Sequence, residues 1–398
     1  MGGGTVGDHQ RVTRPGGNVR RLLLTVTALA VIVVVLLGAG GWYYSDQLLP
    51  APVASGPEHT VVVMEATADT VTLQTTDATP AWSREDLTSD LVLGFASDAG
   101  YLRLTGLEEV VDSDTARWAF EVMTGAAPSV GDLGDLQAYA YPDEPVASLG
   151  PVDEAAVPGP LGTLPAWRFD GDGDTWVVFV HGRGGTRTEG FRAMEVVRDL
   201  GLPALVVSIR NDPGAPPSPD GYGRFGAAEW EDLQAAVDWL QSTEHAERFV
   251  LFGSSQGGGI SAAFLRRSPD ADRVVGAVLD SPLLSIHETL ELQAAGRGIP
   301  GPVVGPLLFA TKAITDLRSG LDFAALEHVA DADELDVPLL VFHGREDSTV
   351  PFEPSARLAE VHDDIRFVPY DGEHVRAWNV DPAAYAAEVR AFLEDVLR

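Results

Sequence analysis

The 398-residue sequence contains no cysteine, and Lys312 is its only lysine. Without cysteine, disulfide bonds, thiol catalysis and cysteine-ligated metal sites are excluded. Only 27 lysine and arginine residues stand against 59 aspartate and glutamate residues, which gives a formal net charge of −32. Because such a surface repels phosphate backbones, we expect no nucleic-acid partner. Hydrophobic residues make up 45% of the chain, so a packed core is expected.

A long apolar run near the N-terminus predicts a membrane anchor. Residues 22–41 are 20 consecutive uncharged and mostly apolar positions, which as a helix span the roughly 30 Å hydrocarbon layer of a bilayer. Four arginines and one acid, Asp8, precede the run, and the aromatic residues 42–44 follow it. We predict a single span over 22–44, with a cytoplasmic tail at 1–21 and the rest of the chain outside the cell membrane.

A cleaved secretory signal is the alternative interpretation of the same run. Signals also begin with basic residues, but their apolar region is usually shorter, at about 7–15 residues. Ala39 and Gly41 imitate the small-x-small pattern of a cleavage site. Both interpretations export the remainder of the chain.

A β-rich segment follows the anchor. Alternating β-branched and polar residues surround Ala68-Asp69, which predicts a hairpin with its turn at these two positions. Further β-rich stretches follow, and we identify no helical spacing among them. We predict a small β-rich domain over 58–141, between a short linker at 45–57 and a proline- and glycine-rich linker at 142–165.

The hydrophobic pattern of the sequence changes at residue 166. From there to the C-terminus, apolar strands alternate with helical patterns. This alternation predicts an α/β domain over 166–398, with a mostly parallel sheet and helices on both faces. The longest break in the alternation covers about 282–336, an insertion at the carboxyl edge of the sheet, where such folds bind ligands. Near-continuous apolar runs, typical of strands buried on both faces, occupy 175–181, 203–209, 248–253, 273–280 and 338–344.

Ser255 is the predicted nucleophile of this domain. It is the centre of Gly253-Ser254-Ser255-Gln256-Gly257, a G-x-S-x-G that ends an apolar strand and precedes a helical pattern. The tight turn strains the backbone of the central residue and requires neighbours without a Cβ. The helix N-terminus then favours negative charge beside the serine. Ser254 is an alternative, but it lacks glycine at the required offset on both sides.

A serine nucleophile needs a histidine base held by a carboxylate, and in this arrangement the acid and then the histidine follow the serine along the chain. Asp347 and His374 lie in the loops after two successive predicted strands, where carboxyl-end loops converge. Asp280, at the end of the preceding strand, is an alternative acid. His343 ends a buried strand and is predicted to have a structural role. Glu373, beside His374, is expected to be solvated.

Two backbone N–H groups are predicted to stabilise the oxyanion of the tetrahedral intermediate. Gln256 follows the nucleophile and supplies one of them. The glycine-rich loop 181–185 supplies the other, from Arg183 or alternatively from Gly184. A phosphate-binding loop is excluded here, because neither the G-x-x-x-x-G-K-[ST] nor the G-x-G-x-x-G spacing is present.

The segments VFVHGRGG, GSSQGG, VFHGREDSTVP and YDGEHV, in this order from about residue 161, resemble the α/β-hydrolase superfamily. PLGTLPAW, SIRNDPGAPPSPDG and AAEWEDLQAAVDW are similar to membrane-anchored actinobacterial hydrolases and, more distantly, to Bem46-like serine hydrolases. The resemblance implies a triad of Ser255, Asp347 and His374 and a lid at 282–336. Gln256 departs from relatives, which often carry methionine or another apolar residue there, and this difference leaves its backbone donor intact.

These features predict an extracytoplasmic serine hydrolase that cleaves carboxylic esters or related acyl bonds through an acyl-enzyme, with no cofactor or metal. A serine peptidase and an acyltransferase are alternatives with the same fold. A surface binding protein with an inactive hydrolase fold is the non-enzymatic alternative, and the sequence indicates no protein partner. The apolar stretch 298–314 is expected either to pack the lid on the core or to line an acyl pocket.

Overall fold

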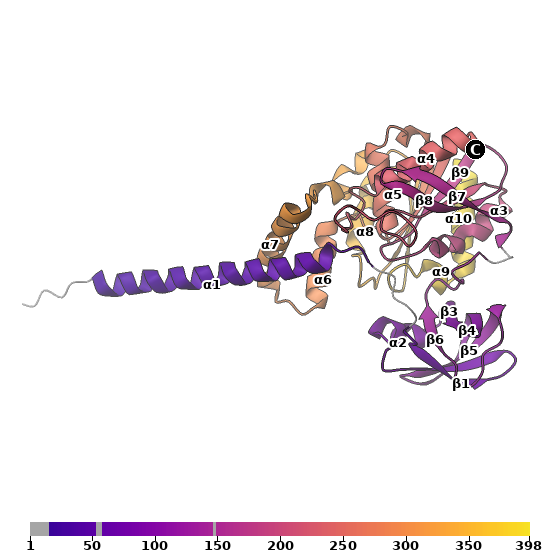
Figure 1. Cartoon of the computed structure of the whole chain (residues 1–398), viewed down its shortest axis with the longest axis horizontal. Coiled ribbons are helices and arrows are strands. Elements are labelled where there is room, and N and C mark those ends of the chain that lie inside the picture. Colours follow the sequence, from indigo (N-terminus) through magenta and orange to yellow (C-terminus); the bar gives the residue numbers. More distant parts are fainter. Residues whose placement is uncertain (1–15, 53–57, 146–148) are drawn as a thin grey trace, which may run out of the picture.

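The computed structural model describes residues 16–52, 58–145 and 149–398. A long N-terminal helix projects from the body of the molecule, which consists of a small β-barrel and a large domain built on an eight-stranded sheet (Figure 1).

Helix α1 (Gly16–Leu48) is longer than the predicted span of 22–44. Among the described residues, it is the one helix that is long and apolar enough to cross a membrane. Residues 19–36 are exposed along their whole length, whereas Ser45 near the end of the helix is buried. The last turn of α1 therefore belongs to the folded body, not to the linker predicted at 45–57.

The β-rich region folds as a closed antiparallel barrel in the strand order β1-β2-β5-β4-β3-β6. Its strands are β1 (Val61–Ala66), β2 (Thr70–Thr75), β3 (Leu93–Ser97), β4 (Gly100–Asp112), β5 (Thr115–Gly125) and β6 (Leu133–Gln137). Trp118 is fully buried in the barrel core, and its indole N–H donates to the carbonyl of Leu87 at 3.2 Å. Leu87 ends helix α2 (Ala81–Leu87), which the sequence analysis missed because two turns are too short to show a helical period.

The large domain has one sheet in the order β14-β13-β12-β11-β9-β10-β8-β7. The strands from β9 to β14 run parallel, whereas β8 is antiparallel to both β10 and β7. Their bounds are β7 (Val152–Gly159), β8 (Gly162–Phe169), β9 (Thr175–Val180), β10 (Ala204–Val207), β11 (Arg248–Ser254), β12 (Val274–Asp280), β13 (Leu339–Gly344) and β14 (Ile365–Tyr370).

Helices cover both faces of this sheet, as predicted for a mostly parallel α/β fold. Helices α4 (Trp230–Glu244), α5 (Gln256–Arg267) and α8 (Glu353–Val361) share one apolar core with the sheet, and α3 (Phe191–Asp199) and α10 (Pro382–Val396) share the other. The insertion after β12 holds α6 (Ile286–Gly296) and α7 (Gly301–Ser319). The remaining short elements are α9 (Ala377–Val380), η2 (Arg187–Gly190), η3 (Ala271–Arg273), η4 (Ala324–Leu326) and η5 (Val329–Glu334).

The linker predicted at 142–165 is structured over most of its length. It contains β7 and the first half of β8, which form a hairpin with a turn between Gly159 and Gly162. Strand β7 lies at the sheet edge and is mostly exposed, so its sequence shows no apolar periodicity and tolerates Pro158. The α/β domain therefore begins near residue 152 and not at 166.

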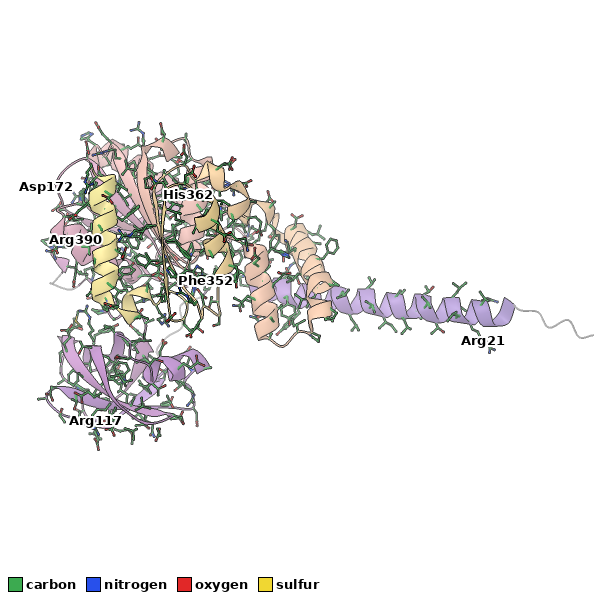
Figure 2. All side chains as sticks on the ribbon, turned by 180° about the vertical axis from the view of Figure 1, so that it is seen from behind. Arg21, Arg117, Asp172, Phe352, His362 and Arg390 are labelled. Carbon is green, nitrogen blue, oxygen red and sulfur yellow. The ribbon has the colours of Figure 1, made fainter. Side chains whose placement is uncertain are left out.

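The barrel contacts the α/β domain beside the end of β14. The side-chain amide of Asn379 donates to the carbonyls of Val92 and Ala138, each at 2.6 Å. Arg376 forms an ion pair with Asp86 of the barrel, with 2.8 Å between Nη2 and Oδ2. Figure 2 shows the barrel and the α/β domain side by side from the opposite direction. These contacts bring the barrel close to the loop that carries His374.

Candidate active site

Ser255 lies in the sharp turn between β11 and α5, at the carboxyl edge of the sheet. Its backbone has φ 51° and ψ −116°, a region that residues with a Cβ rarely adopt. A Cβ on Gly253 would lie 2.4 Å from the carbonyl oxygen of Gly257, and one on Gly257 would lie 2.1 Å from that of Val180. Both flanking glycines are thus required by close backbone contacts, for the reason that the motif predicts.

The side chains of Ser255, His374 and Asp347 form one hydrogen-bonded line. The hydroxyl of Ser255 donates to Nε2 of His374 at 2.9 Å, and Nδ1 of His374 donates to Oδ2 of Asp347 at 2.7 Å. Three different strand ends supply these residues, since Asp347 follows β13 and His374 follows β14. The fold brings together three predicted site residues that lie up to 119 positions apart in the sequence.

Asp347 is held as a buried carboxylate. Although burial raises the pKa of a carboxyl group, hydrogen bonds from His343 and His374 lower the pKa of Asp347 below its ordinary value. Its other oxygen accepts the backbone N–H groups of Thr349 and Val350, at 2.9 and 2.8 Å. The carboxylate is therefore charged and fixed in the direction of His374.

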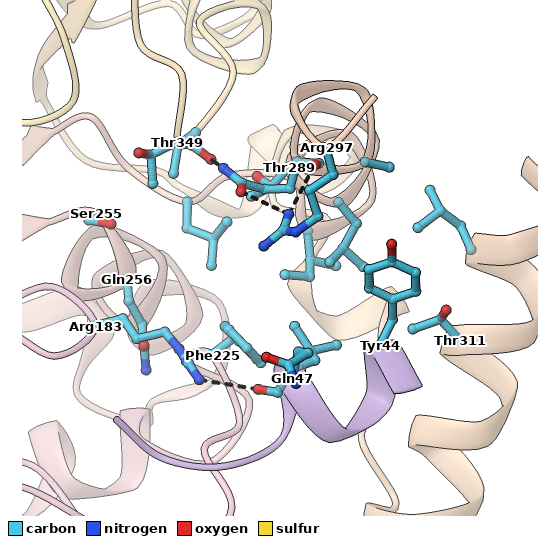
Figure 3. Close-up of a pocket in the computed structure, with 18 of the residues that line it drawn as sticks. Tyr44, Gln47, Arg183, Phe225, Ser255, Gln256, Thr289, Arg297, Thr311 and Thr349 are labelled. Atoms are coloured by element: carbon cyan, nitrogen blue, oxygen red, sulfur yellow. Dashed lines mark hydrogen bonds between the residues drawn. The ribbon is translucent and has the colours of Figure 1, made fainter. Parts of the chain in front are cut away.

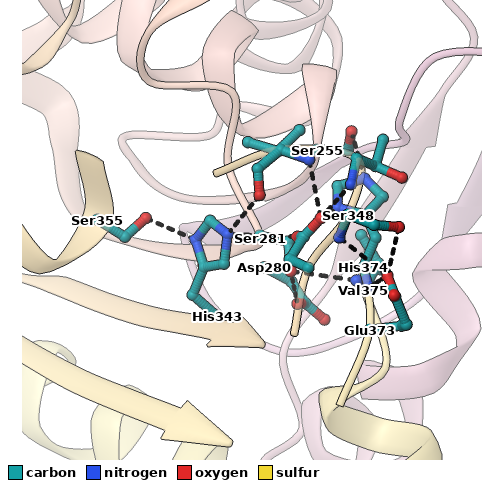
Figure 4. A network of polar contacts seen from close by, with 12 residues as sticks. Ser255, Asp280, Ser281, His343, Ser348, Ser355, Glu373, His374 and Val375 are labelled. Atoms are coloured by element: carbon teal, nitrogen blue, oxygen red, sulfur yellow. Dashed lines mark hydrogen bonds and ion pairs between the residues drawn. The ribbon is translucent and has the colours of Figure 1, made fainter. Parts of the chain in front are cut away.

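The residues considered as alternatives lie near the three hydrogen-bonded side chains but are not part of their line (Figure 4). His343 is fully buried and bonds the hydroxyl of Ser355 at 2.7 Å, with its Nε2 3.3 Å from Asp347, which fits its predicted structural role. Asp280 is buried behind Ser255, and burial raises its pKa to about 6. Within the described residues its carboxylate makes no hydrogen bond to His374. Ser254 is buried at the end of β11.

Two residues that the sequence analysis did not assign to the site support the histidine loop. Glu373 was expected to be solvated, but its carboxylate accepts the N–H and the hydroxyl of Ser348, both at 3.0 Å. Ser281 accepts the N–H of Val375 at 3.1 Å. Both connect the loop of His374 to neighbouring strand ends, a role that depends on tertiary contacts and leaves no motif.

The glycine-rich loop lies directly against the serine. A Cβ on Gly182 would lie 3.1 Å from the Cβ of Ser255, so the loop backbone approaches this serine closely. Among the described residues, the backbone N–H groups of Arg183 and Gln256 donate no hydrogen bond within the chain, and both residues line the same cavity as Ser255. Gly184 faces a separate hollow, close to Pro52.

A buried charged pair supports the glycine-rich loop. His181 bonds the carbonyl of Gly182 through Nδ1 at 2.8 Å and the carboxylate of Asp212 through Nε2 at 2.7 Å. Burial alone would lower the pKa of His181, but Asp212 outweighs it and raises the pKa to about 9. Since both ring nitrogens face acceptors, the imidazole is protonated and donates to both.

A cavity of about 440 Å³ opens in front of Ser255 and His374. Figure 3 shows Ser255, Gln256 and Arg183 on one side and Tyr44 of α1 on the other. Apolar side chains of α6, of α7 and of the segment between them contribute much of the wall, among them Leu290, Ile299, Leu307 and Leu308. Part of the stretch 298–314 thus lines the cavity, whereas Phe309 is 78% exposed and points elsewhere.

Comparisons with known proteins agree with this architecture. Residues 174–319 match a family model described as serine aminopeptidase, S33 (Hydrolase_4). The uncharacterized protein YqkD of Bacillus subtilis is 24% identical over 225 residues, which cover 55% of this chain and 71% of YqkD. The lysophosphatidylserine lipase ABHD12 of Macaca fascicularis is 25% identical over 191 residues, which cover 46% of this chain and 44% of the lipase.

Solved structures of two esterases also superpose on the chain. Esterase Pf2001 of Pyrococcus furiosus has 21% identity and a TM-score of 0.49, covering 62% of this chain and 92% of the esterase. Esterase RhEst1 of a Rhodococcus species has 22% identity and a TM-score of 0.43, covering 62% of this chain and 99% of the esterase.

The mostly parallel sheet and the serine in a strained turn after β11 define an α/β-hydrolase enzyme. Over residues 174–319 the chain is similar to the serine α/β-hydrolases of the Hydrolase_4 family model, and the curated relatives that match it are 24–25% identical. The match to ABHD12 fits the predicted Bem46-like relationship.

Raising the pH should remove the stability that His181 contributes. Its folded-state pKa of about 9 exceeds the ordinary 6.5, so this contribution is complete below pH 6.5 and is lost as the pH rises through 9. The shift corresponds to about 3 kcal/mol in the free energy of unfolding. Between neutral pH and about pH 9, we expect the melting temperature of the wild type to fall by more than the melting temperature of the variant Asp212→Asn. Parallel melting profiles for the two proteins would contradict the assignment.

Proposed function

We propose that the protein is a membrane-anchored serine esterase that hydrolyses acyl esters outside the cytoplasm. The observation that carries the proposal is the unbroken hydrogen-bonded line from Ser255 through His374 to Asp347, at 2.9 and 2.7 Å, at the end of an apolar cavity. These distances lie within the reach that proton transfer between a nucleophile and its base requires.

In the proposed mechanism, the hydroxyl of Ser255 attacks the ester carbonyl while Nε2 of His374 takes its proton. Asp347 holds the imidazole in the tautomer that presents Nε2 as the acceptor, and it stabilises the imidazolium that forms. His374 then returns the proton to the leaving alcohol, which leaves the acyl group on Ser255. Water repeats the sequence on the acyl-enzyme and releases the carboxylic acid.

The backbone N–H groups of Arg183 and Gln256 are the proposed donors to the oxyanion. Both residues line the cavity of Ser255, and neither N–H group donates elsewhere among the described residues. Gly184 was the alternative to Arg183, but it borders the hollow near Pro52 and not the cavity of the nucleophile. Donors fixed in this way stabilise the charge that develops in the transition state.

A peptidase is the second candidate, since the matching family model is described as a serine aminopeptidase. An aminopeptidase must bind the positively charged amino group of its substrate, a task for carboxylate side chains. The described lining of the cavity contains no aspartate or glutamate, although about one residue in seven of the chain is acidic. This lining favours an uncharged acyl group as the substrate.

The proposed anchoring rests on how α1 joins the body. Gly41 and Ser45 are buried, and Tyr44 lines the cavity, so the region where a signal would be cleaved is part of the packed structure. Cleavage after Gly41 would detach the apolar run from the residues that it positions. An uncleaved anchor, with its arginine-rich end in the cytoplasm, is the proposed state.

The triad assignment predicts a ranking of variants. Labelling of the full-length protein by a fluorophosphonate, which reacts with activated serines, should disappear in Ser255→Ala and fall steeply in His374→Ala. Asp347→Asn should lose about four orders of magnitude in turnover, because it presents the wrong imidazole tautomer. Asp280→Asn is the matched control and should stay within about tenfold. Undiminished labelling of Ser255→Ala, or a reversed order of the two aspartates, would overturn the assignment.

The esterase assignment predicts a substrate preference. Each methylene group that an acyl chain buries in the cavity adds about 0.8 kcal/mol of binding, so kcat/KM for p-nitrophenyl esters should rise from acetate to medium chains by tenfold or more. Aminoacyl p-nitroanilides should be cleaved little or not at all, since they lack the acyl chain and bring a positive charge. Faster turnover of the anilides than of the esters would favour the peptidase.

The anchoring proposal predicts the location of the protein. Four arginines precede the apolar run, so protease added to intact cells should digest the C-terminal bulk of the chain. The undigested protein should sediment with membranes. A soluble, shortened form that begins near residue 42 would instead indicate a cleaved signal.

A further inference from the structure

Helix α7 packs against the outer end of α1, where the apolar run 22–41 finishes. A Cβ on Gly40 would lie 2.9 Å from Cδ1 of Leu307, and a Cβ on Gly41 would lie 2.9 Å from the backbone of Ala310. Small residues of this kind allow helix backbones to approach closely. Figure 1 shows α7 alongside α1 at this point. If α1 spans a membrane, α7 lies at the level where the hydrocarbon layer ends.

Polar contacts fix the two helices in this arrangement. Arg318, near the end of α7, forms an ion pair with Asp46 at 2.6 Å and donates to the hydroxyl of Ser45 at 3.0 Å. Its guanidinium also lies over the ring of Trp42, 4.6 Å from the ring centre. The position of α7 relative to the membrane is therefore set by the anchor itself.

The face of α7 opposite its buried side chains is apolar and exposed. The spacing of its members, 4, 3, 4 and 4 residues, places them on one side of the helix. Phe309 is 78% exposed and Leu317 is 86% exposed. We call this face the outer stripe, and it consists of Pro302, Pro306, Phe309, Ala313 and Leu317.

The charge around the outer stripe differs from the rest of the molecule. Residues 292–315 contain no acidic residue, and their charged side chains are Arg297 and Lys312. In a chain with 59 acidic residues and a net charge of −32, most surfaces are repelled by anionic lipid headgroups. Within this segment no acidic side chain adds to that repulsion, and the next acidic residue is Asp316, beside Leu317. Of the two cations, Arg297 lines the cavity and Lys312 lies over the ring of Phe323.

The cavity connects this part of the molecule to the nucleophile. Its wall includes Tyr44 of α1 and Leu307, Leu308 and Thr311 of α7 at one side, and Ser255 at the other (Figure 3). The side chains between them are mostly apolar, including Leu290 and Ala294 of α6. The cavity thus extends from Ser255 to the region where α1 and α7 pack together.

We propose that the outer stripe of α7 lies in the outer leaflet of the anchoring membrane, and that the enzyme takes acyl-ester lipids directly from that leaflet. This inference rests on the proposed anchored esterase. Continuity with the apolar run of α1 identifies the occupant of the stripe as lipid, because both apolar surfaces lie on the same side of the folded body.

The absence of cysteine allows a direct test of the membrane contact. Phe309→Cys or Leu317→Cys in the full-length protein gives a unique site for an environment-sensitive fluorophore. In vesicles of phosphatidylcholine and phosphatidylglycerol, both labels should be quenched by lipids that carry a nitroxide near the headgroup. Val361→Cys, on α8 and 61% exposed, is the matched control and should not be quenched. Unquenched labels at both stripe positions would overturn the membrane contact.

A second measurement tests the route of the substrate. In the double variant Phe309→Ser and Leu317→Ser, the hydrolysis of methylumbelliferyl palmitate held in the vesicles should be slower than in the wild type by about tenfold or more. The reason is that the variant lacks the two apolar side chains that the proposal places in the leaflet. Hydrolysis of water-soluble methylumbelliferyl butyrate should change by less than about twofold, as should both activities of Val361→Ser.

The outcomes separate the two proposals. Equal loss of both activities in the double variant would show that the stripe only supports the lid, and unchanged palmitate hydrolysis would exclude delivery from the leaflet. A wild-type protein that hydrolyses neither ester would instead contradict the proposed esterase, whereas the quenching result would still stand on its own.

Discussion

The structure depends on one sharp turn, between β11 and α5. The turn holds Ser255 at φ 51° and ends the central part of the sheet, which allows two flanking loops to approach the serine. It exists only because Gly253 and Gly257 leave room for neighbouring carbonyl groups. A side chain at either position would collide with backbone and not with a flexible side chain, so the local strain is maintained by the whole sheet.

All three parts of the molecule meet close to that turn. The end of α1 and the residues after it contact the glycine-rich loop, because the guanidinium of Arg183 donates to the carbonyls of Leu48 and Pro50 at 3.2 and 2.6 Å. The barrel contacts the histidine loop through Arg376, which also donates to the carbonyl of His374 at 3.2 Å. Helix α1 and the barrel thus contact two different loops that lie beside Ser255.

The distribution of charge over the surface fits the proposed orientation of the protein on the membrane. The strongly acidic surface keeps most of the body away from anionic headgroups, while residues 292–315, which include most of α7, contain no acidic residue. Inside the body, two buried cations are paired with carboxylates, His181 with Asp212 and Arg210 with Asp232. Without such partners these buried cations would be costly.

The sequence by itself determined the α/β class, the strained turn and the candidates Ser255, Asp347 and His374, because local strand and turn patterns place them at one sheet edge. The edge hairpin β7–β8 and helix α2 escaped prediction, since an exposed edge strand and a two-turn helix carry little periodicity. Only the tertiary structure decided which acid meets the histidine and that α1 lines the cavity. Those choices arise from contacts between residues far apart in the chain, and no local pattern encodes them.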